Sequence, residues 1–102
     1  MEDLIYGYLV KNCVGYDNRV KAKRLQQLFK IDDNKAFRDV IKRIRKDENY
    51  RYAVMSKSSF KGGYWIPTSR EEIEIVSEDF KRRGKFIEDT GETIKNKEYY
   101  KG

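Results

Sequence analysis

Residues 32–46, with the sequence DDNKAFRDVIKRIRK, decide the fold because they predict a helix with two chemically different faces. Four apolar residues recur at the spacing of a single helical stripe, and we expect them to face the core: Phe37, Val40, Ile41 and Ile44. Asp32 or Asp33 can cap the start of this helix, because a carboxylate accepts from unpaired backbone N–H groups of the first turn. Arg45 and Lys46 come at the other end, where the helix dipole favours positive charge.

The outward side of this helix is cationic. The residues opposite the apolar stripe are Lys35, Lys42 and Lys46, and those along one flank are Asn34, Arg38 and Arg45. Such a helix fits the major groove of a DNA duplex, because phosphates attract Lys and Arg while polar side chains near its N-terminus reach base edges. A charge run is also the ordinary solvated face of a surface helix. The neighbouring segments must therefore distinguish the two interpretations.

Composition limits the classes of protein to consider. A chain of 102 residues predicts one domain with a modest core, since 39% of its residues are charged and 38% are apolar. No apolar run approaches the length of about 18 residues that predicts a membrane span, and the start Met-Glu-Asp is unlike a signal peptide, so we expect a cytoplasmic protein. His is absent and Cys13 is the single cysteine, so we expect no metal and no cofactor.

Positive charge is concentrated in one third of the chain. Residues 19–51 hold 12 Lys or Arg against 5 Asp or Glu, whereas residues 69–102 hold 8 against 9. A local excess of this kind is typical of a nucleic-acid footprint more than of general solubility.

The segments before the central helix predict two further helices and a short strand. Asp3 can cap a first helix that ends near Gly15, and Arg19–Lys21 is typical of a minor edge strand. Residues 22–30 predict a second helix, on whose apolar face lie Leu25, Leu28 and Phe29. The connection to the central helix is short enough for a helix-turn-helix.

The segments after the central helix predict a hairpin and a last helix. Residues 52–56 and 64–66 are typical of two strands joined by a Gly-rich turn, with Lys57 and Lys61 at or beside its tip. Ser69 and Glu72 form a capping box in front of a helix that carries Ile73, Val76 and Phe80.

Residues 3–80 resemble the winged-helix variant of the helix-turn-helix fold, in the small form common among bacteriophage and prophage proteins. The matching parts are the strand at Val20, the second helix and turn at 25–31, the recognition helix at 37–44 and the return strand and next helix at 61–66 and 69–73. Two positions depart from the pattern, because Lys30 stands where glycine is common and Lys21 where a Ser or Thr cap is expected. The expected fold class is α+β, in the order α-β-α-α-β-β-α, with an extended C-terminal helix.

The resemblance implies sequence-specific binding of double-stranded DNA, by a phage or mobile-element regulator of transcription, excision or replication. Candidates for base contacts are Asn34, Lys35 and Arg38, and candidates for phosphate contacts are Lys42, Arg45, Lys57 and Lys61. The alternative is a small phage-type inhibitor that uses this fold to bind a host protein or a nucleoprotein complex. We expect neither an enzyme nor a small-molecule substrate, since the chain has no His and no Gly-rich loop between a strand and a helix.

The C-terminal residues 81–102 allow two interpretations, a helical extension or a frayed tail. A seven-residue repeat predicts a seam with a partner helix, and therefore a homodimer, through Ile73, Phe80, Ile87 and Ile94. Against it, Gly84 and Gly91 each cost about 1 kcal/mol of helix stability relative to Ala. In the other interpretation the first of these residues cover the core of a domain at 1–80 and the remainder frays.

Overall fold

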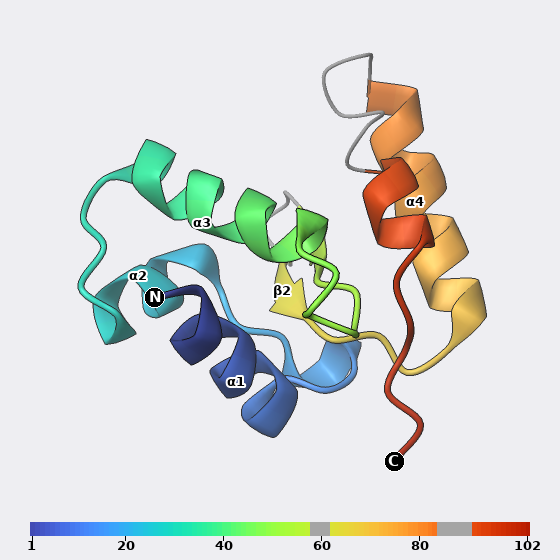
Figure 1. Cartoon of the computed structure of the whole chain (residues 1–102), viewed down its shortest axis with the longest axis horizontal. Coiled ribbons are helices and arrows are strands. Elements are labelled where there is room, and N and C mark those ends of the chain that lie inside the picture. Colours follow the sequence, from blue (N-terminus) through green and yellow to red (C-terminus); the bar gives the residue numbers. More distant parts are fainter. Residues whose placement is uncertain (58–61, 84–90) are drawn as a thin grey trace.

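The computed structural model describes residues 1–57, 62–83 and 91–102. It is an α+β protein in which helices surround an antiparallel sheet that has two strands within the described residues. Helices α1, α2 and α3 lie on one side of the β-hairpin and α4 lies on the other (Figure 1). No helix in the described ranges is long and apolar enough to cross a membrane.

The first helix, α1 (Glu2–Asn12), supports α3 from below in Figure 1 and buries Ile5 and Leu9. It begins without a side-chain cap, so the predicted Asp3 cap is wrong: Asp3 lies inside the first turn and accepts a hydrogen bond from the Tyr50 hydroxyl. The chain then passes through the short 3₁₀ helix η1 (Tyr16–Asn18).

The predicted edge strand is present as a single antiparallel bridge between Val20 and Tyr64. Two backbone hydrogen bonds make the bridge, from Val20 N–H to Tyr64 O at 2.9 Å and from Tyr64 N–H to Val20 O at 2.7 Å. Gly63 permits this approach, because a Cβ atom there would lie 2.8 Å from the Val20 carbonyl oxygen. Residues before α2 are thereby attached to the hairpin.

The turn between α2 (Ala22–Leu28) and α3 (Asn34–Lys46) has a defined geometry. Lys30 adopts a positive φ of 55°, and the Ile31 N–H donates to the Gln26 carbonyl at 2.9 Å, which is the pattern of a Schellman motif. Lys30 therefore takes the conformation for which glycine is preferred. Asp33 caps α3 by accepting from the Lys35 N–H at 3.1 Å, as one of the two predicted alternatives.

The apolar stripe of α3 is confirmed as a core face. Its four residues are at most 6% exposed and pack with residues of α1 and α2 in one cluster: Phe37, Val40, Ile41, Ile44, Ile5, Leu9 and Leu25. A hydrophobic stripe of this width holds a helix against its neighbours through burial of apolar area.

The hairpin consists of β1 (Met55–Lys57) and β2 (Gly63–Trp65), with Met55 opposite Trp65 and Lys57 opposite Gly63. It is shorter than predicted, since Tyr52 bridges Glu98 instead of joining β1. Helix α4 (Arg70–Arg83) follows, and the Ser69 hydroxyl accepts from the Glu72 N–H at 3.2 Å as the capping box predicts.

The C-terminal residues are not a continuation of α4. Residues 91–95 form a separate helical turn that lies beside α4 (Figure 1), and the Ser77 hydroxyl donates to the Gly91 carbonyl at 2.8 Å. In one straight helix these two residues would be about 20 Å apart at 1.5 Å per residue. The expected extended C-terminal helix is therefore absent from the described part of the chain.

Ile94 is fully buried in the same chain, in a second cluster with Ile73 and Phe80. These three side chains are not exposed for a homodimer seam, which corrects that prediction at these positions, and Ile87 lies outside the described residues. The segment is held further along as well, because the Ala53 N–H donates to the Glu98 carbonyl and the Tyr100 N–H to the Pro67 carbonyl. Residues 91–100 are thus part of the fold and not a frayed tail.

Candidate nucleic-acid interface

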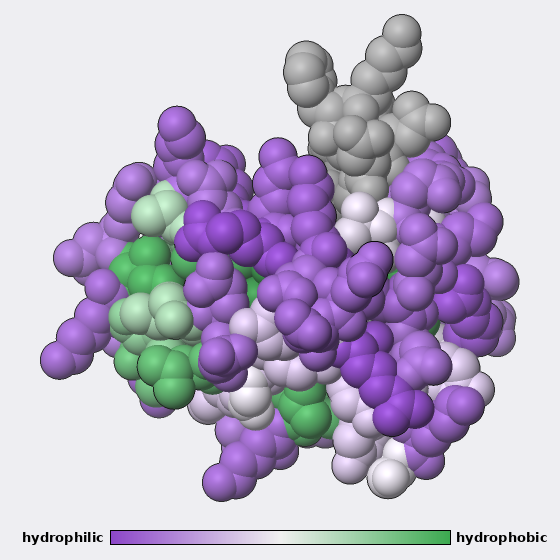
Figure 2. Space-filling model, viewed as in Figure 1, coloured by the Kyte–Doolittle hydropathy of each residue, from purple (hydrophilic) through white to green (hydrophobic). Residues whose placement is uncertain are grey.

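The outward face of α3 carries exposed cations. Because the apolar stripe faces inward, Lys35, Arg38 and Lys42 are turned to solvent, with Lys46 further along the helix. Asp39 is an exposed carboxylate on the same face. In the view of Figure 2 the surface over α3 is hydrophilic, and hydrophobic surface gathers where α1 and α2 lie.

Two of the predicted base-contact residues interact with neighbouring side chains. The Asn34 Oδ1 accepts a hydrogen bond from the Gln26 Nε2 at 3.0 Å, which ties this side chain to the end of α2. Arg38 lies close enough to Tyr64 to act on it: burial raises the pKa of the Tyr64 hydroxyl, and Arg45 and Arg38 oppose that rise. Arg38 is therefore an exposed residue at the boundary between α3 and β2.

Arg45 differs from its predicted role. Its Nε and Nη2 donate to the Val54 carbonyl at 3.0 and 2.9 Å, and Nη2 also donates to the Ser56 hydroxyl at 2.8 Å. The guanidinium carbon lies 5.4 Å from the centre of the Phe80 ring. Burial lowers the pKa of Arg45 to about 10, so it is still a cation at neutral pH. Arg45 thus joins α3 to β1 and α4 and is removed from the set of phosphate contacts.

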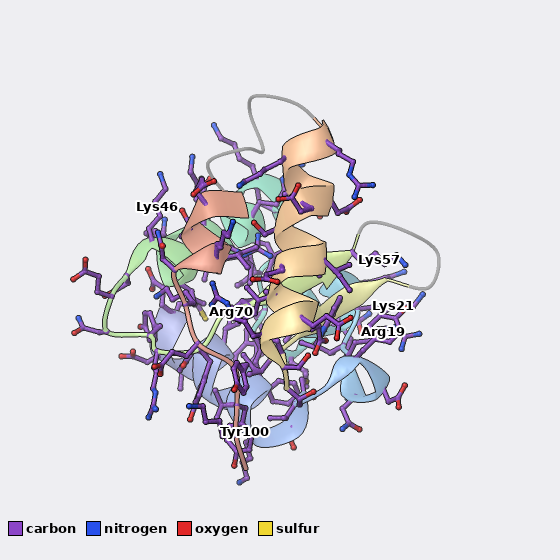
Figure 3. All side chains as sticks on the ribbon, turned by 90° about the vertical axis from the view of Figure 1, so that its right-hand side faces the viewer. Arg19, Lys21, Lys46, Lys57, Arg70 and Tyr100 are labelled. Carbon is purple, nitrogen blue, oxygen red and sulfur yellow. The ribbon has the colours of Figure 1, made fainter. Side chains whose placement is uncertain are left out.

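A second group of cations lies near the loop end of the hairpin. Arg19, Lys21 and Lys57 lie on one side of the molecule in Figure 3, whereas Lys46 lies on the other. They meet because Val20 is bridged to Tyr64 while Lys57 is paired with the adjacent Gly63. The Arg19 guanidinium also stands 4.1 Å from the centre of the Tyr16 ring. We call Arg19, Lys21 and Lys57 the loop-end cluster; the predicted contact Lys61 lies outside the described residues.

The residues Arg19 and Lys21 were missed by the sequence-based assignment, which included Lys57 alone from this cluster. The available signal was the edge strand at residues 19–21, since pairing it with the return strand brings its flanking cations to the hairpin. The sequence did not show how many residues of this segment pair with the return strand. In the structure a single residue, Val20, forms a bridge.

Arg43 is an exposed cation of α3, but its charge is paired with a carboxylate of α1. Its Nε donates to the Glu2 carboxylate at 2.6 Å, and this hydrogen bond lowers the pKa of Glu2. The pair connects α1 to α3 and neutralises one positive charge of the helix.

The described residues offer few side chains for metal binding or for nucleophilic chemistry. Within residues 1–57, 62–83 and 91–102, no three His, Cys, Asp or Glu side chains lie together as a metal site would need. Cys13 is buried, and burial raises the pKa of its thiol, which disfavours the reactive thiolate.

Comparisons of the chain with protein families, with curated proteins and with solved structures found no match.

Proposed function

We propose that the chain is a double-stranded DNA-binding protein of the winged-helix type. The observation that carries this proposal is the exposed row of cations Lys35, Arg38 and Lys42 on a helix whose opposite face is buried. DNA phosphates attract such a row, and binding gains free energy from the release of condensed counterions.

The arrangement of the segments supports the winged-helix assignment. A strand segment at Val20 precedes α2, and its bridge to Tyr64 makes it a neighbour of the hairpin's second strand. The short turn through Lys30 joins α2 to α3, and the hairpin follows α3 in the chain. In this proposal α3 is the recognition helix and the hairpin is the wing.

The contacts are divided between base edges and phosphates. Lys35 and Arg38 lie in the first turns of α3 and have donors for purine edges in a major groove. Lys42 and the loop-end cluster contact phosphates, where a flexible cation suffices. Asn34 keeps its Nδ2 donors for a base edge while its Oδ1 accepts the hydrogen bond from Gln26. The role that we assign to this binding is regulation of transcription, excision or replication in a phage or mobile element.

Fluorescence anisotropy of labelled duplex DNA, titrated with the protein at several salt concentrations, tests the proposal. The dissociation constant should rise steeply with salt, because the logarithm of the association constant falls by about 0.9 per neutralised phosphate for each unit of log salt concentration. Absence of duplex binding at low salt would overturn the proposal.

Three single-charge variants sharpen the experiment. Lys42→Gln should weaken binding about threefold to tenfold and make the salt slope shallower, because one phosphate contact is lost. Asp39→Asn should strengthen binding a few-fold, because it removes a negative charge from the same face. Lys11→Gln, on the last turn of α1, changes the net charge as Lys42→Gln does and should leave the affinity nearly unchanged. Equal losses in both lysine variants would mean that net charge alone drives binding.

A further inference from the structure

A groove of about 770 Å³ runs between η1 and α4. It lies on the α4 side of the hairpin, and α4 faces the viewer in Figure 3. The size is within the range of about 300–1,000 Å³ that is usual for binding pockets. Residues from η1, from the end of β1 and from α4 line it.

The floor of the groove is apolar. Tyr16 and Trp65 pack edge to face with ring centres 4.9 Å apart, and Val76 packs beside them in the second core cluster. Ile75 also lines the groove and is 62% exposed, although the inner face of α4 is formed by Ile73 and Phe80. A single exposed apolar residue is common on protein surfaces, but Ile75 lines the same hollow as Val76 and is open to a ligand there.

The rim of the groove is negatively charged in a chain whose net charge is +6. Its acidic residues are Asp17, Glu71, Glu72 and Asp79, against the cations Lys57 and Arg82. Glu72 is already engaged, since its carboxylate accepts from the Trp65 indole N–H and from the Thr68 N–H. Asp17 and Glu71 are exposed on opposite walls, one on η1 and one in the first turn of α4.

We propose that this groove binds a short basic segment of a partner protein. In the complex an apolar side chain of the segment covers Ile75 and Val76, and its Lys or Arg side chains lie between Asp17 and Glu71. The complementarity of charge selects this class of ligand, because phosphate groups are repelled by these carboxylates and an acidic peptide would be repelled as well. The site is independent of the DNA-binding proposal and is formed by other residues, apart from Lys57 at its end.

Selection from a displayed library of short random peptides on the full chain identifies a probe without knowledge of the partner. The enriched peptides should combine Lys or Arg with an apolar residue, although the net charge of +6 opposes binding of basic peptides in general. The most enriched peptide is then synthesised and titrated calorimetrically against the wild type and variants. Absence of enrichment, or enrichment of acidic peptides, would overturn the proposal.

Matched variants locate the binding. Ile75→Ser should lower the affinity for the peptide about tenfold, because it removes the exposed apolar contact. Glu71→Gln should lower the affinity about threefold. Glu78→Gln removes the same charge from an exposed position of α4 outside the groove and should change nothing. Circular dichroism checks that each variant is folded. Equal affinities for the Ile75→Ser variant and the wild type would place the peptide elsewhere and overturn the proposal.

A second copy of the chain is the other occupant that the experiment detects. Sedimentation without peptide should give a monomer at the concentrations used for the titrations. A dimer that is abolished by Ile75→Ser would mean that the groove receives another copy of this chain, and it would overturn the assignment to a partner protein.

Discussion

The two halves of α3 use the same sequence pattern for different purposes. Arg38 and Arg45 are seven residues apart and share a flank of the helix, yet Arg38 is exposed and Arg45 is tied to Val54 and Ser56. The difference arises from what lies beside each half. Near Arg45 the chain before β1 and the Phe80 ring of α4 close over the helix, whereas near Arg38 the neighbour is Tyr64 of β2.

The C-terminal half of α3 is also anchored by the end of the chain. The Lys97 ammonium donates to the carbonyls of Asp47 and Tyr50, directly after α3 ends, and burial lowers the pKa of Lys97. The Arg70 guanidinium in turn donates to the carbonyls of Lys95 and Lys97. The Arg45 flank and the C-terminal end of the helix are therefore fixed to the body of the protein, whereas Lys35, Arg38 and Lys42 present their charges to solvent. Helical periodicity predicts the flank of a residue but not which part of that flank other segments cover.

The largest expected effect comes from removing the core support beneath the anchored half. Ile94→Ala should lower the free energy of unfolding by about 2–4 kcal/mol, because Ile94 is 0% exposed and packs with Phe80, whose ring faces Arg45. Urea denaturation followed by circular dichroism measures the change. A loss below about 0.5 kcal/mol, as surface positions show, would mean that residues 91–102 are detached in solution.

A smaller effect on stability should distinguish Arg45 from Arg38. Arg45→Ala should cost about 2 kcal/mol, because it leaves the Val54 carbonyl and the Ser56 hydroxyl without their donor. Arg38→Ala should change the stability by less than about 0.5 kcal/mol, because its side chain is exposed. The same urea titration compares them. Equal losses in the two variants would contradict the difference between the halves.

The smallest effect concerns the pH dependence of the C-terminal attachment. The hydrogen bond from Arg51 lowers the pKa of Glu98 below its ordinary value of 4.5. A carboxyl whose pKa is lower in the folded state stabilises the fold above its unfolded pKa, and this contribution is lost as the pH falls through the folded pKa. The urea midpoint of the wild type should therefore fall as the pH is lowered from neutral to acid. The fall should be slightly smaller in the Glu98→Gln variant, which lacks this carboxyl. Because the pair is exposed, we expect a modest difference. An identical acid dependence of the two proteins would show that the ion pair contributes nothing.

Much of the fold was predictable because it depends on short-range patterns. The stripe through Phe37, the Ser69 cap and the Val20 strand follow from spacing and residue type alone. The role of Arg45 was not predictable, since its acceptors come from a segment whose placement depends on the tertiary fold. The seven-residue spacing of Ile94 is compatible with packing against a helix of a second chain and equally with packing against α4 of its own chain. Only the reversal of the chain after α4 distinguishes the two cases.

Backbone amide NMR spectra of the labelled protein, recorded while a short DNA duplex is added at low salt, test the central claim most directly. We expect the largest chemical-shift changes at Lys35, Arg38 and Lys42 and in residues 19–21, and small changes at Lys11 and Ile75. Changes that are largest around Ile75, or that are absent throughout, would contradict the assignment of the outward face of α3 as a DNA-binding surface.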